Sequence, residues 1–261
     1  MRVRRSFLFV WCGLSTWLSL ALWSFAVTET EMAASSLRYR GGVHNAFSKR
    51  ALKPKQLQTL LKSLRAHSGW PQLDFDADGF LVCPDEAQFN SGSAAARKLL
   101  SAAMDAPMAF DLESHTNTAN VAFARLDVPA HFRSMASGRQ INVYPVQFDF
   151  ADFAALRGET EVVAAFDIGL VFMHELAHGV WSLRDALSDA DALGECERYI
   201  NQIRRELNLP ERQHYAARTR SSGVSVAGGV AHYAELLFRR NDARKPAHYY
   251  LQWDAQRVGR T

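Results

Sequence analysis

The sequence predicts one α+β domain, with a mixed or antiparallel sheet built from its first half and a mostly helical second part. Segments that alternate apolar and polar residues, as strands do, gather in the first half at 108–113, 121–126 and 140–150. Residues 164–185 are apolar at nearly every position, which is typical of a buried helix. Residues 189–207 have the length and ending of a second helix.

Length and composition place the chain among ordinary globular proteins. It has 261 residues, of which 48% are hydrophobic and 22% charged, enough to build a large core. The net charge of +3 is too small to indicate a nucleic-acid partner. The late arginines are interleaved with acids and lack an aromatic stacking pattern, so we expect no nucleic-acid binding.

The amino terminus has the layout of an export signal. Three of its first five residues are arginine, and residues 7–27 carry no charge. Small residues suit cleavage after Ala26, but the apolar run is also long enough to stay as a membrane anchor. The folded part is therefore expected outside the cytoplasm, periplasmic or extracellular. We expect three parts: a signal peptide or signal anchor at 1–27, a polar tether at 28–42 and one domain at 43–261.

Two helices are predicted early in the domain. Pro54 opens the first, and apolar residues follow it at the 3, 4, 7 spacing of one buried stripe: Leu57, Leu60, Leu61 and Leu64. Residues 93–104, rich in alanine and leucine, form the second.

Residues 73–84 alternate around Asp78 and Gly79, which indicates two short strands joined by a tight turn. The same stretch places Asp74, Asp76 and Asp78 at calcium-loop spacing. The twelfth position of such a loop would be Asp85 instead of glutamate, and the flanks resemble strands. The pattern favours a hairpin.

Residues 140–150 form a strand with Pro145 inside it. Proline cannot donate to a ladder hydrogen bond, so this strand is predicted at the edge of the sheet. An edge strand just before the buried helix would suit an extended peptide that binds as one more strand.

Three polar residues interrupt the apolar helix at one place: His174, Glu175 and His178. Buried polar groups need partners, and residues four apart share a helix face. The two imidazoles can therefore meet at a metal ion, with Glu175 beside them to accept a proton. This HExxH arrangement resembles that of the zincin metallopeptidases. The resemblance implies a zincin-like fold, Zn2+ as cofactor, a peptide or protein substrate, and peptide-bond hydrolysis by a zinc-activated water with Glu175 as general base.

A catalytic zinc site of this kind uses three protein ligands and a water. Trp181 and Arg184 stand where the short-spaced zincins have glycine and histidine, so that class is excluded. In the glutamate zincins a later helix supplies a glutamate ligand and, four residues on, an aspartate that holds the first histidine. Glu197 and Asn201 resemble that pair, with Asn201 in place of aspartate. The metal ligands are then His174, His178 and Glu197.

Other third ligands remain open: Glu195, two residues earlier, or an aspartate zincin ligand at Asp189 or Asp191. These acids would also suit the solvated face of a surface helix. Residues 201–212 resemble a segment that follows the motif in certain bacterial effector and toxin-associated metallopeptidases. An oxyanion-stabilising residue is not singled out among the candidates His214, His232, Tyr233, Tyr249 and Tyr250.

Outside the signal region the sequence has two cysteines, Cys83 and Cys196, which would either pair or stay as buried thiols. Two rival functions stand beside the peptidase. One is an exported module in which zinc only holds the fold together, marked by a fourth protein ligand. The other is a membrane-tethered interaction protein with the protease fold and no metal.

Overall fold

The structure is a computed structural model that describes residues 40–45, 49–83, 91–133, 140–187, 193–226, 229–240 and 246–259. The chain separates into two compact units, Met1–Tyr39 with Phe132–Gln140, and Arg40–His131 with Ile141–Thr261. The fold and the site belong to the second unit. The predicted signal or anchor at 1–27 lies outside the described residues.

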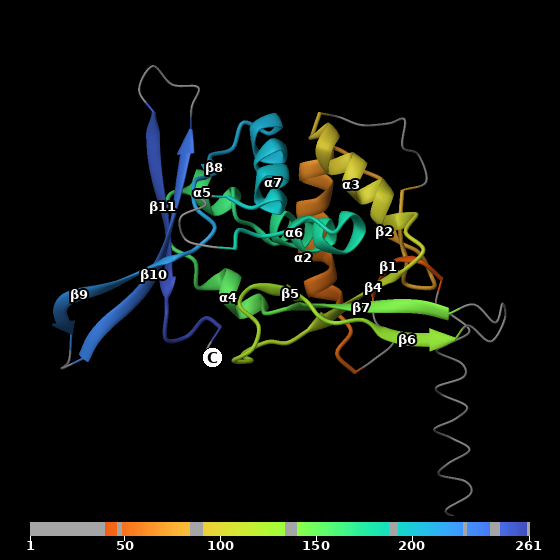
Figure 1. Ribbon diagram of the computed structural model, residues 1–261, viewed down its shortest axis with the longest axis horizontal. Helices are drawn as coiled ribbons and strands as arrows, with labels where there is room; N and C mark the ends of the chain where they lie inside the picture. The colour runs from red at the N-terminus through yellow and green to blue at the C-terminus, as the bar shows by residue number, and fades with distance from the viewer. Residues whose placement is uncertain are drawn as a thin grey trace, which may run out of the picture. The chain divides into compact units, whose positions relative to one another are not determined.

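The first sheet has the strand order β1-β4-β7-β5. Strands β1 (Gly42–Asn45) and β7 (Gln140–Phe148) both run parallel to β4 (Ala109–Ser114), which lies between them. Strand β5 (Ala124–Leu126) runs antiparallel to β7, and β6 (Ala130–Arg133) also pairs with β7 (Figure 1). The sheet is therefore mixed, in agreement with the predicted α+β class.

The prediction that the Pro145 strand lies at the sheet edge is wrong, because β7 lies between β4 and β5. The carbonyl of Pro145 accepts a hydrogen bond from Asp127 N at 2.8 Å, one residue beyond the end of β5. A residue's N–H and C=O point to the same side of a strand, so the missing N–H of Pro145 faces the place where β5 has already ended. The short β5 is an edge strand beside β7, and β1 is the strand at the opposite edge of the sheet.

The two early helices are confirmed as α2 (Pro54–Ser68) and α3 (Ala94–Met104). The predicted stripe of α2 is buried at Leu60, Leu61 and Leu64, and Ser93 caps α3 by accepting a hydrogen bond from Ala96 N. Together with α6 (Ile168–Trp181) and α7 (Glu195–Glu206), they contribute to one hydrophobic core with the first sheet. Two short helices were not predicted: α4 (Phe150–Ala154) and α5 (Thr160–Ala164).

The predicted hairpin is confirmed as β2 (Asp74–Phe75) and β3 (Leu81–Val82), which pair antiparallel. Asp76 Oδ1 accepts hydrogen bonds from Asp78 N at 3.0 Å and Phe80 N at 2.8 Å. The Asp76 carboxylate thus holds the turn through backbone N–H groups, as turn aspartates commonly do. Asp85 lies outside the described residues.

Helix α6 lies at the centre of the core and carries the HELAH residues (Figure 1). The stretch Thr160–Trp181 is long and apolar enough to cross a membrane, yet 67% of its most apolar window is buried inside the protein. A Cβ built on Gly179 would lie 2.2 Å from Phe110 Cε1. Glycine at that position lets the helix approach the ring of β4.

A second sheet replaces the mostly helical second part that the sequence predicted. It contains β8 (Glu211–Arg212), β9 (Arg218–Val226), β10 (Gly229–Arg240) and β11 (Ala247–Asp254). Strand β11 alternates in burial, with Leu251 and Trp253 buried and their neighbours more exposed. This period of two is the strand signal. Among the residues after α6 that the structure describes, α7 alone confirms the helical expectation.

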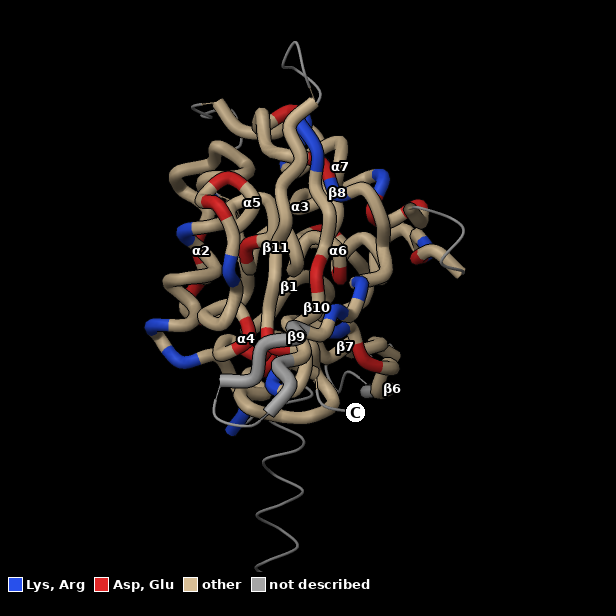
Figure 2. The backbone as a smooth tube through the Cα atoms, turned by 90° about the vertical axis from the view of Figure 1, so that its left-hand side faces the viewer, with Lys and Arg blue, Asp and Glu red and all other residues tan. Residues whose placement is uncertain are grey.

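A second core cluster joins this sheet to the rest of the unit. The Phe123 ring packs edge-on against Phe166 at 5.1 Å and against Trp253 at 5.2 Å between centroids. Along the backbone, basic and acidic positions are interspersed (Figure 2). Their numbers nearly balance, which gives the net charge of +3.

Asp152 in α4 is a buried carboxylate beside this cluster and is 5% exposed. Its Oδ2 accepts a hydrogen bond from Phe123 N at 3.0 Å. Burial raises the pKa of Asp152 to about 6, with a further rise from Asp149, despite the hydrogen bond from Phe123. The folded protein therefore binds this proton more tightly than the unfolded chain, and stability is lost as the pH rises from about 4 to about 6.

Asp152→Asn should remove that loss, because the amide has no charge and its oxygen can still accept from Phe123 N. Relative to wild type, the stability of the variant is expected to rise by on the order of 1 kcal/mol between pH 4 and pH 7.5, allowing for solvent screening. Urea unfolding at both pH values measures the difference, and Asp254→Asn, at a partly exposed position, is the control. A stability difference that does not change with pH would contradict the expectation.

Candidate functional site

The HELAH residues bring two imidazoles together on α6. His174 and His178 are four apart, so one helix face carries both. Their Nε2 atoms lie 3.1 Å apart, and the two rings are nearly perpendicular, at 83°. His174 is 9% exposed and belongs to the core face of the helix.

Asp185 completes this group from the turn that follows α6. The helix ends at Trp181, and Ser182 adopts a left-handed conformation with φ 55° that turns the chain back. Leu183 O then accepts a hydrogen bond from His178 Nδ1 at 2.6 Å. Two residues later, Asp185 Oδ1 lies 3.1 Å from His174 Nε2 and Oδ2 lies 3.2 Å from His178 Nε2.

The outer nitrogens of both histidines have oxygen partners. His178 Nδ1 faces the carbonyl of Leu183, and His174 Nδ1 lies 3.5 Å from Glu197 Oε2. A nitrogen that faces a carbonyl oxygen must carry the hydrogen, which leaves Nε2 of a neutral imidazole with its lone pair. In the neutral form of each imidazole, the Nε2 lone pair is thereby directed towards Asp185.

Glu197 occupies a different place from the one the sequence analysis expected. It is 1% exposed and lies on the Nδ1 side of His174, whereas Asp185 lies on the Nε2 side. Its Oε1 accepts a short hydrogen bond from Arg204, and its Oε2 accepts one from Arg212 at 3.0 Å. The arginines outweigh the effect of burial and lower the pKa of Glu197 to about 2. The geometry brings Asp185, and not Glu197, to the two Nε2 atoms.

Asn201 does not hold His174 either. Its Oδ1 accepts hydrogen bonds from Arg212 N at 2.9 Å and Arg204 Nη1 at 2.8 Å, and its Nδ2 donates to Arg212 O at 2.8 Å. Asn201 therefore joins α7 to β8. The predicted ligand partner is a structural link.

Tyr215 braces the group from the loop after β8. Its hydroxyl donates to Asp185 Oδ2 at 2.7 Å, and its ring stacks on His174 at a centroid distance of 6.1 Å. Burial raises the pKa of Tyr215, and the Asp185 carboxylate raises it further, so the hydroxyl stays protonated and donates. Neither Tyr215 nor Asp185 was among the site residues predicted from the sequence.

The charges in this group stabilise one another. Burial raises the pKa of Asp185, but its contacts with His174 and His178 outweigh burial and hold the pKa well below its usual range. Burial lowers the pKa of His178, but Asp185 and the Leu183 carbonyl outweigh it and raise that pKa to about 9.

Glu175 lies beside the histidines and is tied to the sheet edge. Its Oε2 accepts a hydrogen bond from Leu126 N in β5 at 2.8 Å. Burial raises the pKa of Glu175, although His174 and the Leu126 hydrogen bond act in the opposite direction. A carboxylate whose pKa is raised towards neutrality is suited to exchange protons.

Cys196, at the start of α7, is the fourth potential ligand near the group. Ligand atoms of His174, His178, Asp185 and Cys196 all lie within 4.8 Å of one another. The Cys196 thiol is buried and contacts His174 O at 3.2 Å, and burial raises its pKa. No disulfide joins Cys83 to Cys196, so the alternative in which the two cysteines pair is wrong.

A cavity of about 310 Å³ opens beside the histidines. His174, Glu175 and Tyr215 lie on its wall. Most of the remaining lining is apolar and comes from the start of β5 and the residues before it, from α6 and the turn before it, and from β10 and β11: Ala122, Phe123, Ala124, Phe166, Leu170, Val171, Leu236 and Trp253.

The other sequence candidates lie elsewhere. Glu195 is exposed at the first turn of α7, where its carboxylate accepts a hydrogen bond from Arg184 N at 3.3 Å. Asp189 and Asp191 lie outside the described residues. The residues named as oxyanion candidates are absent from the described cavity wall: His214, His232, Tyr233, Tyr249 and Tyr250.

Comparison of the chain with protein families, curated proteins and solved structures found no match.

Proposed function

We propose that this protein is a zinc-dependent hydrolase of peptide bonds with a zincin-type active site. The observation that carries the proposal is the convergence of His174 Nε2, His178 Nε2 and the Asp185 carboxylate next to Glu175. Two imidazoles and one carboxylate form a usual protein ligand set for catalytic zinc. The resemblance of the HELAH sequence to zincin metallopeptidases supports the same class.

The donor group fits a dication better than it fits hydrogen bonding alone. Asp185 Oδ1 is buried, yet no residue that the structure describes gives it a hydrogen bond. The Nε2 atoms of His174 and His178 lie 3.1 Å apart, so one hydrogen between them can serve both. At least one of the two nitrogens then has a lone pair that faces the Asp185 carboxylate. A dication held by His174, His178 and Asp185 would satisfy these atoms together. We therefore propose Asp185 as the third ligand in place of Glu197.

The outer contacts resemble those that orient metal ligands in proteins. Glu197 faces Nδ1 of His174, Leu183 O accepts from Nδ1 of His178, and Tyr215 donates to Asp185. Such partners fix the tautomer and the ring orientation and increase ligand basicity. Glu197 would thus act on the metal through His174.

Bound zinc would polarise the scissile carbonyl and bring the pKa of a water towards neutrality. Glu175 would accept the proton from the attacking water and pass it to the leaving amine. The Leu126 hydrogen bond uses Oε2 and leaves Oε1 of Glu175 for this proton. The apolar wall of the cavity would exclude bulk water from the reacting groups.

A peptide substrate would approach along β5, the edge strand whose Leu126 contacts Glu175. An extended peptide binds such an edge by adding a strand. The strand proposed to pair with a peptide is therefore β5, and not β7 as the sequence predicted. Export to the periplasm or the exterior, with residues 7–27 either cleaved or kept as a membrane tether, stays an expectation from the sequence.

Asp185→Ala should abolish stoichiometric metal binding, because it removes one of three ligands. The test is the zinc and iron content of the purified full chain by mass spectrometry, with Glu195→Ala as the matched carboxylate control. We expect about one zinc per chain in wild type and in the control, and none in Asp185→Ala. Iron instead of zinc, or metal retained by Asp185→Ala, would contradict the proposal.

A structural zinc site is the second candidate, because Cys196 lies close enough to close the coordination with a fourth ligand. The thiol's contact with His174 O and its raised pKa disfavour the thiolate that a zinc ligand needs. Cys196→Ala discriminates the two functions in the same metal measurement. The peptidase proposal expects zinc to remain, whereas a closed structural site would lose it.

A further inference from the structure

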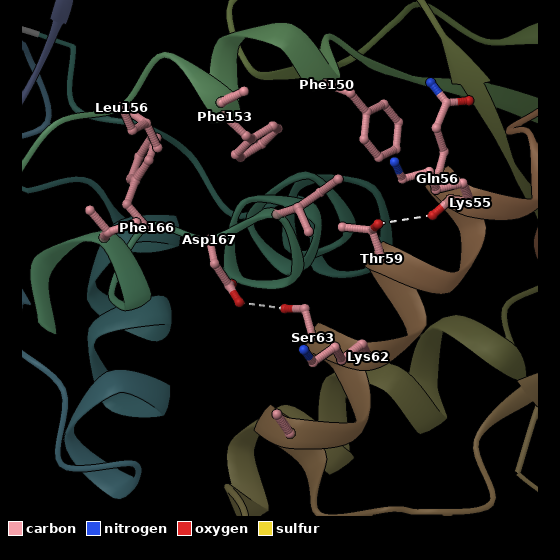
Figure 3. Close-up of a pocket in the computed structure, with 14 residues that line it drawn as sticks. Lys55, Gln56, Thr59, Lys62, Ser63, Phe150, Phe153, Leu156, Phe166 and Asp167 are labelled. Carbon is pink, nitrogen blue, oxygen red and sulfur yellow. Dashed lines mark hydrogen bonds between the residues drawn. The ribbon is translucent and has the colours of Figure 1, made fainter. Parts of the chain in front are cut away.

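A larger cavity, of about 720 Å³, shares the Phe166 wall with the cavity beside His174 but has no other lining residue in common with it, and the proposed hydrolysis does not use it. Helices α2, α4 and α5 and the start of α6 surround it (Figure 3). This volume falls within the range of about 300–1,000 Å³ that is usual for small-molecule sites.

The walls of the cavity are mainly apolar. Figure 3 shows Phe150 and Phe153 extending from α4 towards the side chains of α2, with Leu156 and Phe166 on the opposite side. Phe150, Phe153 and Leu156 are only partly buried, although large apolar groups usually are buried. An apolar ligand in the cavity would remove these side chains from water.

Two cations stand at the α2 side of the cavity. Lys55 and Lys62 are seven residues apart, so they lie on one face of the helix, and both are exposed. Neither forms an ion pair with any residue in the described part of the chain. The uncharged polar groups of Gln56 and Thr59 lie between them.

The one acid in the cavity wall, Asp167, is already compensated. Its Oδ2 accepts a hydrogen bond from Ser63 at 2.6 Å, and its Oδ1 lies 2.8 Å from His67 Nε2 and accepts from Leu170 N at 3.0 Å (Figure 3). The carboxylate caps α6 and is engaged on both oxygens. The free charge at the cavity is therefore positive.

We propose that this cavity binds a single long-chain carboxylate anion, with its acyl chain against Phe150, Phe153 and Leu156 and its carboxylate between Lys55 and Lys62. The apolar wall accounts for the chain, and the two unpaired ammonium groups account for the headgroup. The ligand is a free acid of the fatty-acid class and not a membrane surface, because a cavity of this volume takes one chain.

Isothermal titration of the full chain with decanoate, below its micelle concentration, tests the proposal. Each methylene buried adds a roughly fourfold gain in affinity, so decanoate, with two more methylenes, should bind roughly fifteenfold tighter than octanoate. Uncharged 1-decanol should bind several-fold more weakly than decanoate, since it gains nothing from the lysines.

Two variants locate the ligand. The double variant Lys55→Gln with Lys62→Gln should weaken decanoate roughly fivefold and leave decanol unchanged. Ala154→Trp introduces a large ring from an exposed wall position and should abolish binding of both ligands. Lys49→Gln, an exposed lysine away from the cavity, is the control. Circular dichroism verifies that each variant is folded, and binding elsewhere on the chain would be the same in all of them.

The proposal is overturned if decanoate does not bind, if Ala154→Trp binds it as wild type does, or if the lysine variant does not weaken it. Binding to vesicles of anionic phospholipid without binding to decanoate would also overturn it, and would indicate a membrane surface instead. Failure of the zinc proposal changes none of these results, because no residue of the metal group takes part.

Discussion

Glu175→Gln is expected to lower kcat/KM for peptide hydrolysis on the order of 10³-fold, within the 10²- to 10⁴-fold range of general acid–base catalysis. Glutamine has the same shape and can still accept the hydrogen bond from Leu126 N, so the side chain should stay in place. What is lost is the group that accepts and returns the proton. The defect should therefore appear as a lower kcat, with little change in KM.

The measurement uses zinc-loaded full chain and a mixed library of internally quenched peptides. Zinc content should remain at about one per chain in the variant, because Glu175 is not a proposed ligand. Glu161→Gln, an exposed acid of α5, is the control and should match wild type. Undiminished hydrolysis by Glu175→Gln would show that another group moves the proton.

Glu197→Gln is expected to destabilise the fold by about 3–5 kcal/mol, the usual cost of removing one partner from a buried ion pair. Glu197 is 1% exposed, and its carboxylate compensates two guanidinium groups, those of Arg204 and Arg212. Arg204 is itself 2% exposed and cannot reach water when the partner is lost. The isosteric amide leaves both positive charges in place.

Urea unfolding of the metal-free proteins measures this cost without a contribution from metal binding. Glu211→Gln is the matched control, because Glu211 pairs at 2.8 Å with Arg205, which is 63% exposed, and its loss should cost at most about 1 kcal/mol. If Glu197→Gln instead keeps its stability and loses its zinc, Glu197 is a ligand and the Asp185 assignment is wrong.

The centre of the site could be read from the sequence because its signal is local. His174, Glu175 and His178 belong to one helix, and their relation depends only on helical periodicity. The buried face of α7 also has a readable 3, 4, 7 pattern, formed by Glu197, Ile200, Asn201 and Arg204. The pairing of Glu197 with Arg204, seven residues later, was therefore available as a sign that its carboxylate is already engaged.

Asp185 could not be found in the same way. Its position depends on a left-handed Ser182, and the sequence offers neither glycine nor asparagine there to mark the turn. Arg184 occupies the position at which the short-spaced zincins have their third ligand, and the Asp185 carboxylate follows it by one residue. Tyr215 reaches the site only through the tertiary placement of the loop after β8, which leaves no local pattern.

The errors in the fold have a similar cause. Pro145 predicts an edge strand only if a neighbouring strand needs its backbone N–H. In β7 the side that lacks this N–H faces a place beyond the end of β5, so no ladder hydrogen bond is lost there. For β11, by contrast, the alternate burial of Leu251 and Trp253 follows a simple period of two. Residues 247–254 therefore carry a sequence pattern typical of a strand.

Asp185 follows His178 by seven residues, whereas Leu126 and Glu175 are 49 apart in the sequence. Short loops close at a lower entropic cost than long ones, and local contacts form earlier during folding. The metal ligands can therefore assemble while the sheet is still incomplete, but Glu175 is positioned only after β5 has docked. If the proposed hydrolase function holds, a newly made chain is expected to bind metal before Glu175 is in place, and hydrolysis would then begin only once the fold is complete.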